Sequence, residues 1–365
     1  LLTDTLTVSL TSKALTGTGL ADGTATTQTV AVTGTAYDFA AATHAANLAL
    51  GNLRVNTAQR TLAVTNALAA NGTAAYQDTL DVTATSSNAR LGVVSGATGI
   101  AATATGDVTV RAITAGSLAG NLTLGFTSKA LAGSGLADAS LANGTVAVTG
   151  AAFDLATATV ASSLALNNVR TGTLTNVSVG NVVTTSAAFQ DSLDVAATSS
   201  NGKLTLTNPA NIAAGASRNL VVNAATAGDL GATLTLGLTS NANGVAGLTN
   251  AALANRTVTV TGAAYDLANA SLNSTVAFGG VRVGATSNLA VTNTVITAAA
   301  FQDDLGVTAV AGTTQLGIAN PALISAGATR NVVVTAAKAG LLTDTLTVSL
   351  TSKALTGTGL ADGTA

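Results

Sequence analysis

Apolar and hydroxyl-bearing residues alternate along most of this chain. In residues 5–11 (TLTVSLT), every second residue is Leu or Val, and the residues between them are Thr or Ser. Similar short runs recur between stretches rich in Gly, Asn and Asp, for example at 30–32, 62–64 and 108–110. A period of two residues is typical of strands with one buried face, and Gly, Asn and Asp favour turns. The pattern therefore predicts an all-β fold.

The expected strands belong to a long internal repeat. Tyr37, Phe153 and Tyr265 occupy the same position in the segments TVAVTGTAYD, TVAVTGAAFD and TVTVTGAAYD, and they lie 116 and 112 residues apart. Each segment is followed by a second related one, AYQDTLDV, AFQDSLDV or AFQDDLGV. A right-handed β-helix, the structural alternative, would repeat every ~20–50 residues, whereas the observed period has the size of an independent domain. We therefore expect tandem immunoglobulin-like antiparallel β-sandwiches in a head-to-tail array, each with about seven short strands.

The two ends of the chain carry the same sequence. Residues 1–25 recur letter for letter as residues 341–365, whereas the internal copies of this segment have diverged. The sequence therefore resembles one period of a longer array. Glycines close the last strand of each unit, and they divide the chain into four predicted segments: 1–34, the final strands of a preceding domain; 35–150 and 151–262, two complete domains; and 263–365, a third domain without its closing strand.

The third predicted domain lacks a counterpart of residues 26–34 (TTQTVAVTG). In one interpretation, which the verbatim copy favours, the polypeptide continues and this sequence is a window of a longer chain. In the other, separate subunits join head to tail, and a strand of one subunit completes the sheet of the next. Both interpretations make the chain its own partner in a filament-forming contact. The predicted polymer junction consists of Thr29, Val30, Ala31, Val32 and Thr33.

Composition narrows the class of protein. Charged residues make up only 8% of the chain and glutamate is absent, which disfavours helical surfaces, while 47% apolar residues permit packed cores. A net charge of −2 gives no basis for binding nucleic acid. No apolar run approaches the ~20 residues that would insert into a bilayer. The chain also has no Cys or Met to be oxidised. We expect an extracellular or cell-surface location.

The sequence offers few residues for catalysis or metal binding. His44 is the only histidine, and we interpret it as a solvated linker residue. Without cysteine, zinc and other transition-metal sites lack their usual ligands. Calcium is the one metal to weigh, at three aspartates that follow the repeated aromatic residues: Asp38, Asp154 and Asp266. Calcium-loop spacing and glutamate are absent, and such aspartates commonly form Asx turns. We therefore predict no catalytic residue, no cofactor and no enzymatic activity, with calcium as the alternative.

Basic residues recur at equivalent positions of the repeat. Three arginines at one equivalent position are expected either to form a contact between domains or to lie at a solvated strand edge: Arg54, Arg170 and Arg282. A second set, in which Asn241 replaces lysine in one unit, does not favour a repeated isopeptide cross-link: Lys13, Lys129 and Lys353.

Short motifs give the chain a family resemblance. FG at 278–279, VRVG at 281–284, VTN at 291–293 and AGA at 326–328 follow one another in the order of the bacterial choice-of-anchor D repeats. The chain resembles this family, which belongs to the immunoglobulin-like group that includes the Hydin-type domains. The first two units match with fewer of these residues; for example, LGNLRV at 50–55 lacks the phenylalanine. The resemblance implies tandem sandwiches on exported bacterial proteins and no enzymatic activity.

These observations favour a structural protein of an extracellular bacterial filament, stalk or matrix fibre. The alternative is a surface adhesin whose repeats act as a spacer or as modules that bind glycans or a host. The chain has only 3 Tyr and 6 Phe and no Trp, which disfavours glycan binding through aromatic platforms. A third hypothesis places a catalytic domain outside this sequence.

Overall fold

The computed structural model describes residues 2–57 and 59–365. Within them the chain forms β-strands, turns and three short 3₁₀ helices, η1 (Ala74–Tyr76), η2 (Ala187–Phe189) and η3 (Ala299–Phe301). The predicted all-β class is confirmed. Leu1, the first residue of the predicted segment 1–34, lies outside the described residues. Within the described part of the chain, no helix has the length and apolar character that crossing a bilayer requires.

The chain divides into two compact units, Leu1–Asp154 with Val245–Leu248, and Leu155–Gly244 with Thr249–Ala365. The first unit contains a β-hairpin and one sandwich, and the second contains two sandwiches. Each sandwich is immunoglobulin-like and has an apolar core of its own. The separate cores explain why the sequence pattern restarts with every repeat.

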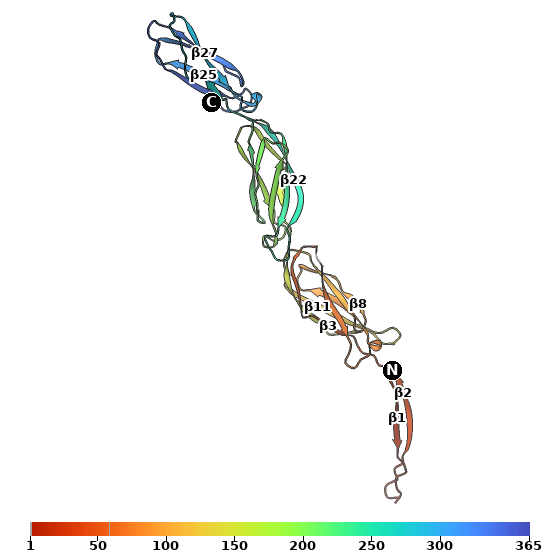
Figure 1. Cartoon of the computed structure of the whole chain (residues 1–365). Helices are drawn as coiled ribbons and strands as arrows, with labels where there is room; N and C mark the ends of the chain where they lie inside the picture. Colours follow the sequence, from red (N-terminus) through yellow and green to blue (C-terminus); the bar gives the residue numbers. More distant parts are fainter. Residues whose placement is uncertain (1, 58) are drawn as a thin grey trace. The chain divides into compact units, whose positions relative to one another are not determined.

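The first unit begins with an antiparallel hairpin of β1 (Leu2–Leu10) and β2 (Thr26–Gly34). Figure 1 shows the two strands side by side. Among the described residues they pair only with each other. No second sheet of the described chain covers them, and Val30 and Val32 are consequently 50% and 46% exposed. The hairpin keeps the alternating pattern of a sandwich strand without the core that the pattern predicts.

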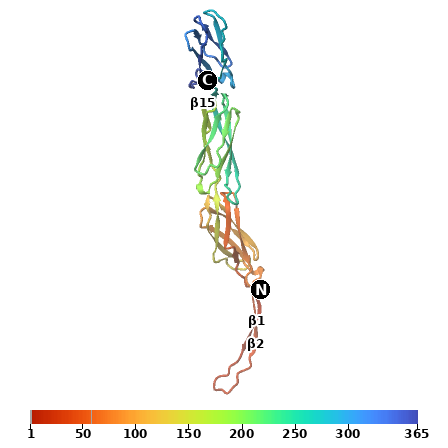
Figure 2. The same cartoon turned by 60° about the vertical axis from the view of Figure 1, so that its left-hand side comes forward.

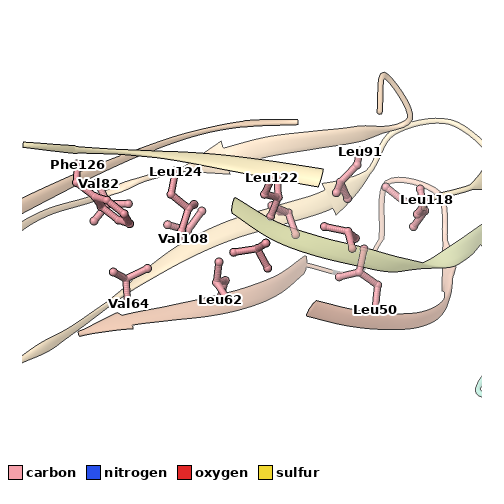
Figure 3. Close-up of a cluster of buried hydrophobic side chains, with 14 of the residues drawn as sticks. Leu50, Leu62, Val64, Val82, Leu91, Val108, Leu118, Leu122, Leu124 and Phe126 are labelled. Carbon is pink, nitrogen blue, oxygen red and sulfur yellow. The ribbon is translucent and has the colours of Figure 1, made fainter. Parts of the chain in front are cut away.

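The first sandwich packs two sheets face to face. One sheet has the order β3-β5-β9-β7, formed by β3 (Ala41–His44), β5 (Gln59–Ala67), β9 (Thr105–Ala112) and β7 (Leu91–Ser95). The other has the order β10-β13-β11-β6-β8, with β4 beside β13 and β12 beside β11: β10 (Gly116–Ser117), β13 (Gly144–Phe153), β11 (Gly120–Lys129), β6 (Thr79–Ser86), β8 (Ala97–Ile100), β4 (Asn47–Arg54) and β12 (Ala139–Ser140). In Figure 3, Leu62, Leu122 and Leu124 point into the space between the sheets, where all three are buried.

The second sandwich, in the second unit, repeats this design. One sheet has the order β14-β16-β19-β18, formed by β14 (Ala158–Val160), β16 (Leu174–Asn181), β19 (Ser217–Ala224) and β18 (Leu204–Thr207). The other has the order β15-β22-β21-β17, with β20 beside β22: β15 (Ser163–Arg170), β22 (Ala251–Tyr265), β21 (Ala232–Asn241), β17 (Ser192–Ser199) and β20 (Gly228–Asp229). The long β22 is labelled in Figure 1 and β15 in Figure 2.

The third sandwich has a complete first sheet and a smaller second one. The first sheet has the order β23-β24-β27-β26, formed by β23 (Ala270–Leu272), β24 (Thr286–Asn293), β27 (Thr329–Ala336) and β26 (Leu316–Ala319). The second has only the order β25-β28-β29, formed by β25 (Asp304–Ala311), β28 (Leu346–Lys353) and β29 (Gly363–Thr364). Its core is correspondingly smaller than the other two.

The two complete sandwiches each contain a closing strand. β13 pairs antiparallel with β11 and parallel with β4, and β22 does the same with β21 and β15. Both strands bend at a glycine of positive φ, Gly150 (145°) and Gly262 (141°). A Cβ at these positions would lie 2.6 Å from the carbonyl oxygen of Gly51 and 2.4 Å from that of Asn167. The neighbouring backbone therefore approaches too closely for any side chain.

Candidate functional site

Four buried polar side chains lie together in the third sandwich: Asn293, Gln302, Asp303 and Ser352, each 0% exposed. The Nδ2 atom of Asn293 donates to the carbonyl oxygens of Asp303 (2.9 Å) and Ile324 (3.0 Å). Gln302 Nε2 donates to Asn293 Oδ1 at 2.9 Å. Ser352 Oγ donates to Asp303 Oδ2 at 2.7 Å. We call these four residues, and their repeat counterparts, the polar cluster. Its hydrogen bonds satisfy buried polar groups and hold the residues after η3 against the sheets.

The same polar cluster occurs in the other two sandwiches. In the first it consists of Asn66, Gln77, Asp78 and Ser128, and in the second of Asn181, Gln190, Asp191 and Ser240. The serine hydroxyl again donates to the aspartate, at 2.8 Å in the first sandwich and 2.7 Å in the second. The recurring Gln-Asp pairs of the sequence thus belong to buried networks.

Arg170 carries a guanidinium from the second sandwich to the polar cluster of the third. Its Nη2 lies 2.8 Å from Asp303 Oδ2 and donates to the carbonyl oxygen of Ala361 at 2.7 Å. The side chain of Asp303 is 0% exposed and that of Arg170 is 25% exposed. An ion pair this buried becomes strongly destabilising when one partner is removed, because the other charge is left without compensation. The pair therefore couples the two sandwiches of the second unit.

Neighbours of Arg170 extend this contact. Asn168 Nδ2 donates to the carbonyl oxygen of Thr358 at 3.0 Å, and Thr171 Oγ1 donates to Asp266 Oδ1 at 3.0 Å. Arg170 thus makes the inter-domain contact that was one interpretation of the recurring arginines. Arg282, by contrast, is exposed and forms no ion pair within the described residues.

The closing strand explains why Arg170 reaches this position. β15 runs parallel to β22, with Arg170 opposite Tyr265 at the end of both strands. The Tyr265 ring lies 5.5 Å from the Phe301 ring of η3, measured between centroids, and Asp303 follows η3 two residues later. Because β22 leads directly into the third sandwich, its partner β15 ends beside the polar cluster.

The three aspartates of the predicted calcium site lie in different repeats. Asp266 accepts the Thr171 hydroxyl, and its backbone N–H donates to the carbonyl oxygen of Phe301 at 2.9 Å. The backbone of Asp38 pairs with Gln77 in the equivalent bridge of the first sandwich. Among the described residues, no three His, Cys, Asp or Glu side chains gather as metal ligands would. Calcium at Asp38, Asp154 and Asp266 stays a prediction from the sequence.

His44 is not a linker residue. It ends β3, its ring lies 5.8 Å from the ring of Phe126 between centroids, and its Nδ1 lies 2.9 Å from the carbonyl oxygen of Ala45. A Cβ on Gly144 would lie 2.4 Å from His44 Nε2, so the ring packs closely against the start of β13. The sequence missed this packing because it depends on strands far apart in the chain.

The recurring lysines form ion pairs across loops. Lys13 pairs with Asp22, Lys129 with Asp138, and Lys353 with Asp362, each aspartate nine residues after its lysine. The Lys129 hydrogen bond, and secondly that of the Ala130 N–H, hold the pKa of Asp138 below its ordinary value. In the second sandwich both partners are replaced, by Asn241 and Asn250, and Asn250 Oδ1 accepts the Ala242 N–H at 2.9 Å. Where asparagine replaces the lysine, asparagine therefore also replaces its aspartate partner.

A groove of about 510 Å³ opens in the third sandwich. Its walls include Leu289 and Val334 of the first sheet, Leu346 and Val348 of β28, and Phe278 before β24. All five belong to the core of the third sandwich, but Leu346, Val348 and Phe278 are only partly buried. The groove therefore exposes part of a sandwich core.

The groove lies where the complete sandwiches hold their closing strand. In the first sandwich, β13 lies between β4 and β11. The repeat counterparts of β4 and β11 in the third sandwich are residues 275–282 and β28, and the first residues of both segments line the groove, up to Phe278 and Val348. Residues 275–282 form no strand, whereas β4 and β15 form one by pairing solely with a closing strand. The described residues include no closing strand for the third sandwich, which explains both the groove and the irregular segment.

The predicted polymer junction, Thr29 to Thr33, lies in β2 and is exposed throughout. Val30 and Val32 correspond to Val146 and Val148 of β13, which are 0% and 2% exposed. The same TVAVTG sequence is therefore a buried closing strand in one place and an exposed hairpin strand in the other.

Sequence reasoning missed the asparagine and serine of the polar cluster, although a signal was present. Leu62, Val64 and Asn66 share one face of β5, and Phe126 and Ser128 share one face of β11. A polar residue that falls in the buried register of a strand must find a partner inside the protein. The period-two pattern could therefore have identified both residues.

No model of a known protein family matches the sequence, and no curated protein matches it. Among solved structures, the chain is similar to the human desmocollin-1 ectodomain, with 9% identity, coverage of 95% of this chain and 62% of that chain, and a TM-score of 0.31. It is also similar to the Escherichia coli adhesin FdeC, with 16% identity, coverage of 86% of this chain and 94% of that chain, and a TM-score of 0.24. A further similar structure is the S-layer protein SbsC, with 14% identity, coverage of 94% of this chain and 47% of that chain, and a TM-score of 0.25. At such TM-scores, these likenesses establish no function for the chain.

Proposed function

We propose that this chain is a structural component of an extracellular bacterial filament, stalk or matrix fibre, with a mechanical and non-enzymatic role. The observation that carries the proposal is the open groove of the third sandwich, for which the chain itself holds a matching strand, β2. The resemblance to choice-of-anchor D repeats and an extracellular or cell-surface location belong to the same proposal. The partner is the chain itself, either as its own continuation or as a second copy.

The burial of two valines supports strand addition. Val30 and Val32 are 50% and 46% exposed in the hairpin, and a closing strand would bury them as fully as their counterparts in β13. Burying an exposed valine side chain contributes up to about 1.5–3 kcal/mol, and roughly half of that remains available to side chains that are already half buried. Main-chain hydrogen bonds to residues 275–282 would add to this gain. Those to β28 would replace the pairing of β2 with β1, which has the same register as the pairing of β13 with β11. The groove is therefore expected to bind the β2 sequence.

A peptide of residues 26–34 tests this proposal. Added to dilute, monomeric chain, it should raise the melting temperature of the third sandwich in proportion to the logarithm of its concentration. A peptide with Val32→Asp should lose the effect, because its counterpart Val148 is buried. The matched control is Ala31→Asp, since its counterpart Ala147 is exposed in β13. If the unmodified peptide leaves the melting temperature unchanged, the proposed strand addition is wrong.

The denatured mass of the subunit from its natural source separates the two modes of continuation. A mass far above 35.0 kDa supports one continuous polypeptide, and a mass near 35.0 kDa supports subunits that exchange a strand. The adhesin alternative has less support, because Phe39 and Tyr76 are the only exposed large aromatic side chains in the described part of the chain.

A further inference from the structure

Asp78 is a buried carboxylate in the polar cluster of the first sandwich. It is 4% exposed, and its Oδ2 accepts the Ser128 hydroxyl at 2.8 Å. Its Oδ1 is buried and has no hydrogen-bond partner, as is also true of Asp303 Oδ1, so the two carboxylates differ in the cation at Oδ2. No cation pairs with Asp78 among the residues that the structure describes. A carboxylate taken out of water is costly unless a positive charge or several donors compensate it.

Asp303 shows what compensates the equivalent carboxylate. Its Oδ2 accepts the Ser352 hydroxyl, as Asp78 accepts Ser128, and it also contacts Arg170 Nη2 at 2.8 Å. The guanidinium comes from the sandwich that precedes Asp303 in the chain. The described residues that precede the first sandwich form the hairpin of β1 and β2, and they include no arginine.

We propose that Asp78 receives the guanidinium of Arg282 from a second copy of this chain. The inference rests on the proposed function, because it requires β2 of one copy to close the third sandwich of another. Arg282 is the repeat counterpart of Arg170, and it is exposed. It is the last residue of the segment 275–282, which forms no strand and lines the groove through Thr275, Val276 and Phe278.

The register of the second sandwich places the two residues together. Arg170 lies opposite Tyr265 in the parallel pair of β15 and β22. By the repeat, Arg282 of one copy would lie opposite Tyr37 of the other once β2 fills the groove. Tyr37 packs edge-on against Tyr76 at 5.8 Å between ring centroids, and Tyr265 packs against Phe301 at 5.5 Å with the rings tilted. Tyr76 ends η1 and Asp78 follows two residues later, so the guanidinium would arrive beside the carboxylate.

Arg282→Gln tests the proposal in the full chain by sedimentation of the self-associated species. Because Arg282 is exposed and the monomer gives it no ion pair, the variant should fold normally. A charge-assisted hydrogen bond contributes enough that its loss should weaken association about ten-fold or more. The matched control is Arg330→Gln, an exposed arginine of the same sandwich, which should leave association unchanged.

Asp78→Asn supplies the second arm. It keeps an acceptor for Ser128, so the single variant and the Arg282→Gln/Asp78→Asn double variant should associate about as weakly as Arg282→Gln alone. Additive losses of affinity in the double variant would overturn the pairing of Arg282 with Asp78, and so would an Arg282→Gln variant that associates as well as the unmodified chain. In either case, a peptide that still stabilises the third sandwich would continue to support the proposed function. Absence of both the peptide effect and self-association would overturn the two proposals together.

Discussion

Replacing Arg170 with glutamine is expected to uncouple the second and third sandwiches. The substitution removes the guanidinium and leaves a shorter, uncharged polar side chain. Asp303 would remain 0% exposed, with the Ser352 hydroxyl as its hydrogen-bond donor. The loss should therefore appear in the stability of the third sandwich, which contains the abandoned carboxylate.

The structure sets the size of this effect. Breaking a fully buried ion pair from one side costs about 3–5 kcal/mol. The Arg170 side chain is 25% exposed, so water can enter once the guanidinium is gone. The loss of stability should therefore be closer to that of a hydrogen bond to a charged group, which is smaller than that of a fully buried ion pair. We expect a loss of about 1.5–3 kcal/mol. For a domain of ~100 residues, this corresponds to a fall in melting temperature of roughly 6–20 °C.

Hydrogen exchange of β25 and β28 in the full chain measures the local free energy of opening, and a double-mutant cycle with Asp303→Asn isolates the pair. The cycle should give a coupling energy of about 1–3 kcal/mol. A matched control is Arg218→Gln, an exposed arginine of the second sandwich, which should leave exchange unchanged. A coupling energy below about 0.3 kcal/mol would show that Arg170 and Asp303 act independently and would refute the reasoning.

Three further predictions follow from local geometry. Gly262→Ala should destabilise the second sandwich by about 1–3 kcal/mol in thermal unfolding, because its φ is 141° and its Cβ would meet a backbone oxygen; Gly280→Ala, with open space around it, should not. Asn181→Leu should cost about 2 kcal/mol or more in urea unfolding, since two buried carbonyl oxygens lose their donor. Asp138 has a lowered pKa, so its loop contact is present above the ordinary value of about 4 and is lost as the pH falls through the lower folded-state pKa; amide exchange in its loop should rise there, while the Asn250 loop shows no such step.

Several elements could be predicted because their causes are local. The alternation of apolar and hydroxyl-bearing residues predicts the strands, since a strand exposes successive side chains on opposite faces. Gly150 and Gly262 could be located because the same sequence surrounds them in each repeat, and they lie where a side chain would collide with the backbone. The prediction that they close their strands is wrong, because β13 continues to Phe153 and β22 to Tyr265. The Lys–Asp pairs are also local, because each aspartate lies nine residues after its lysine.

Other features could not be predicted from their own neighbourhood in the sequence. His44 is the last residue of β3 and has no histidine counterpart in the other repeats, and only the pairing of distant strands reveals its contact with Phe126. The serine of the polar cluster lies about 50 residues after its aspartate, in a different strand. Residues 275–282 resemble a strand in sequence but form none, because their only partner would be a closing strand.

By itself, the sequence determined the all-β class and the period of the repeat, because both depend on spacings that neighbouring residues impose. Only the tertiary structure decided that Arg170 meets Asp303, 133 residues away, because that contact requires β15 to run parallel to β22 and end beside η3. It also decided that TVAVTG is buried in β13 and exposed in β2. A strand's pattern specifies which face it can bury, but a second sheet must be present to cover that face.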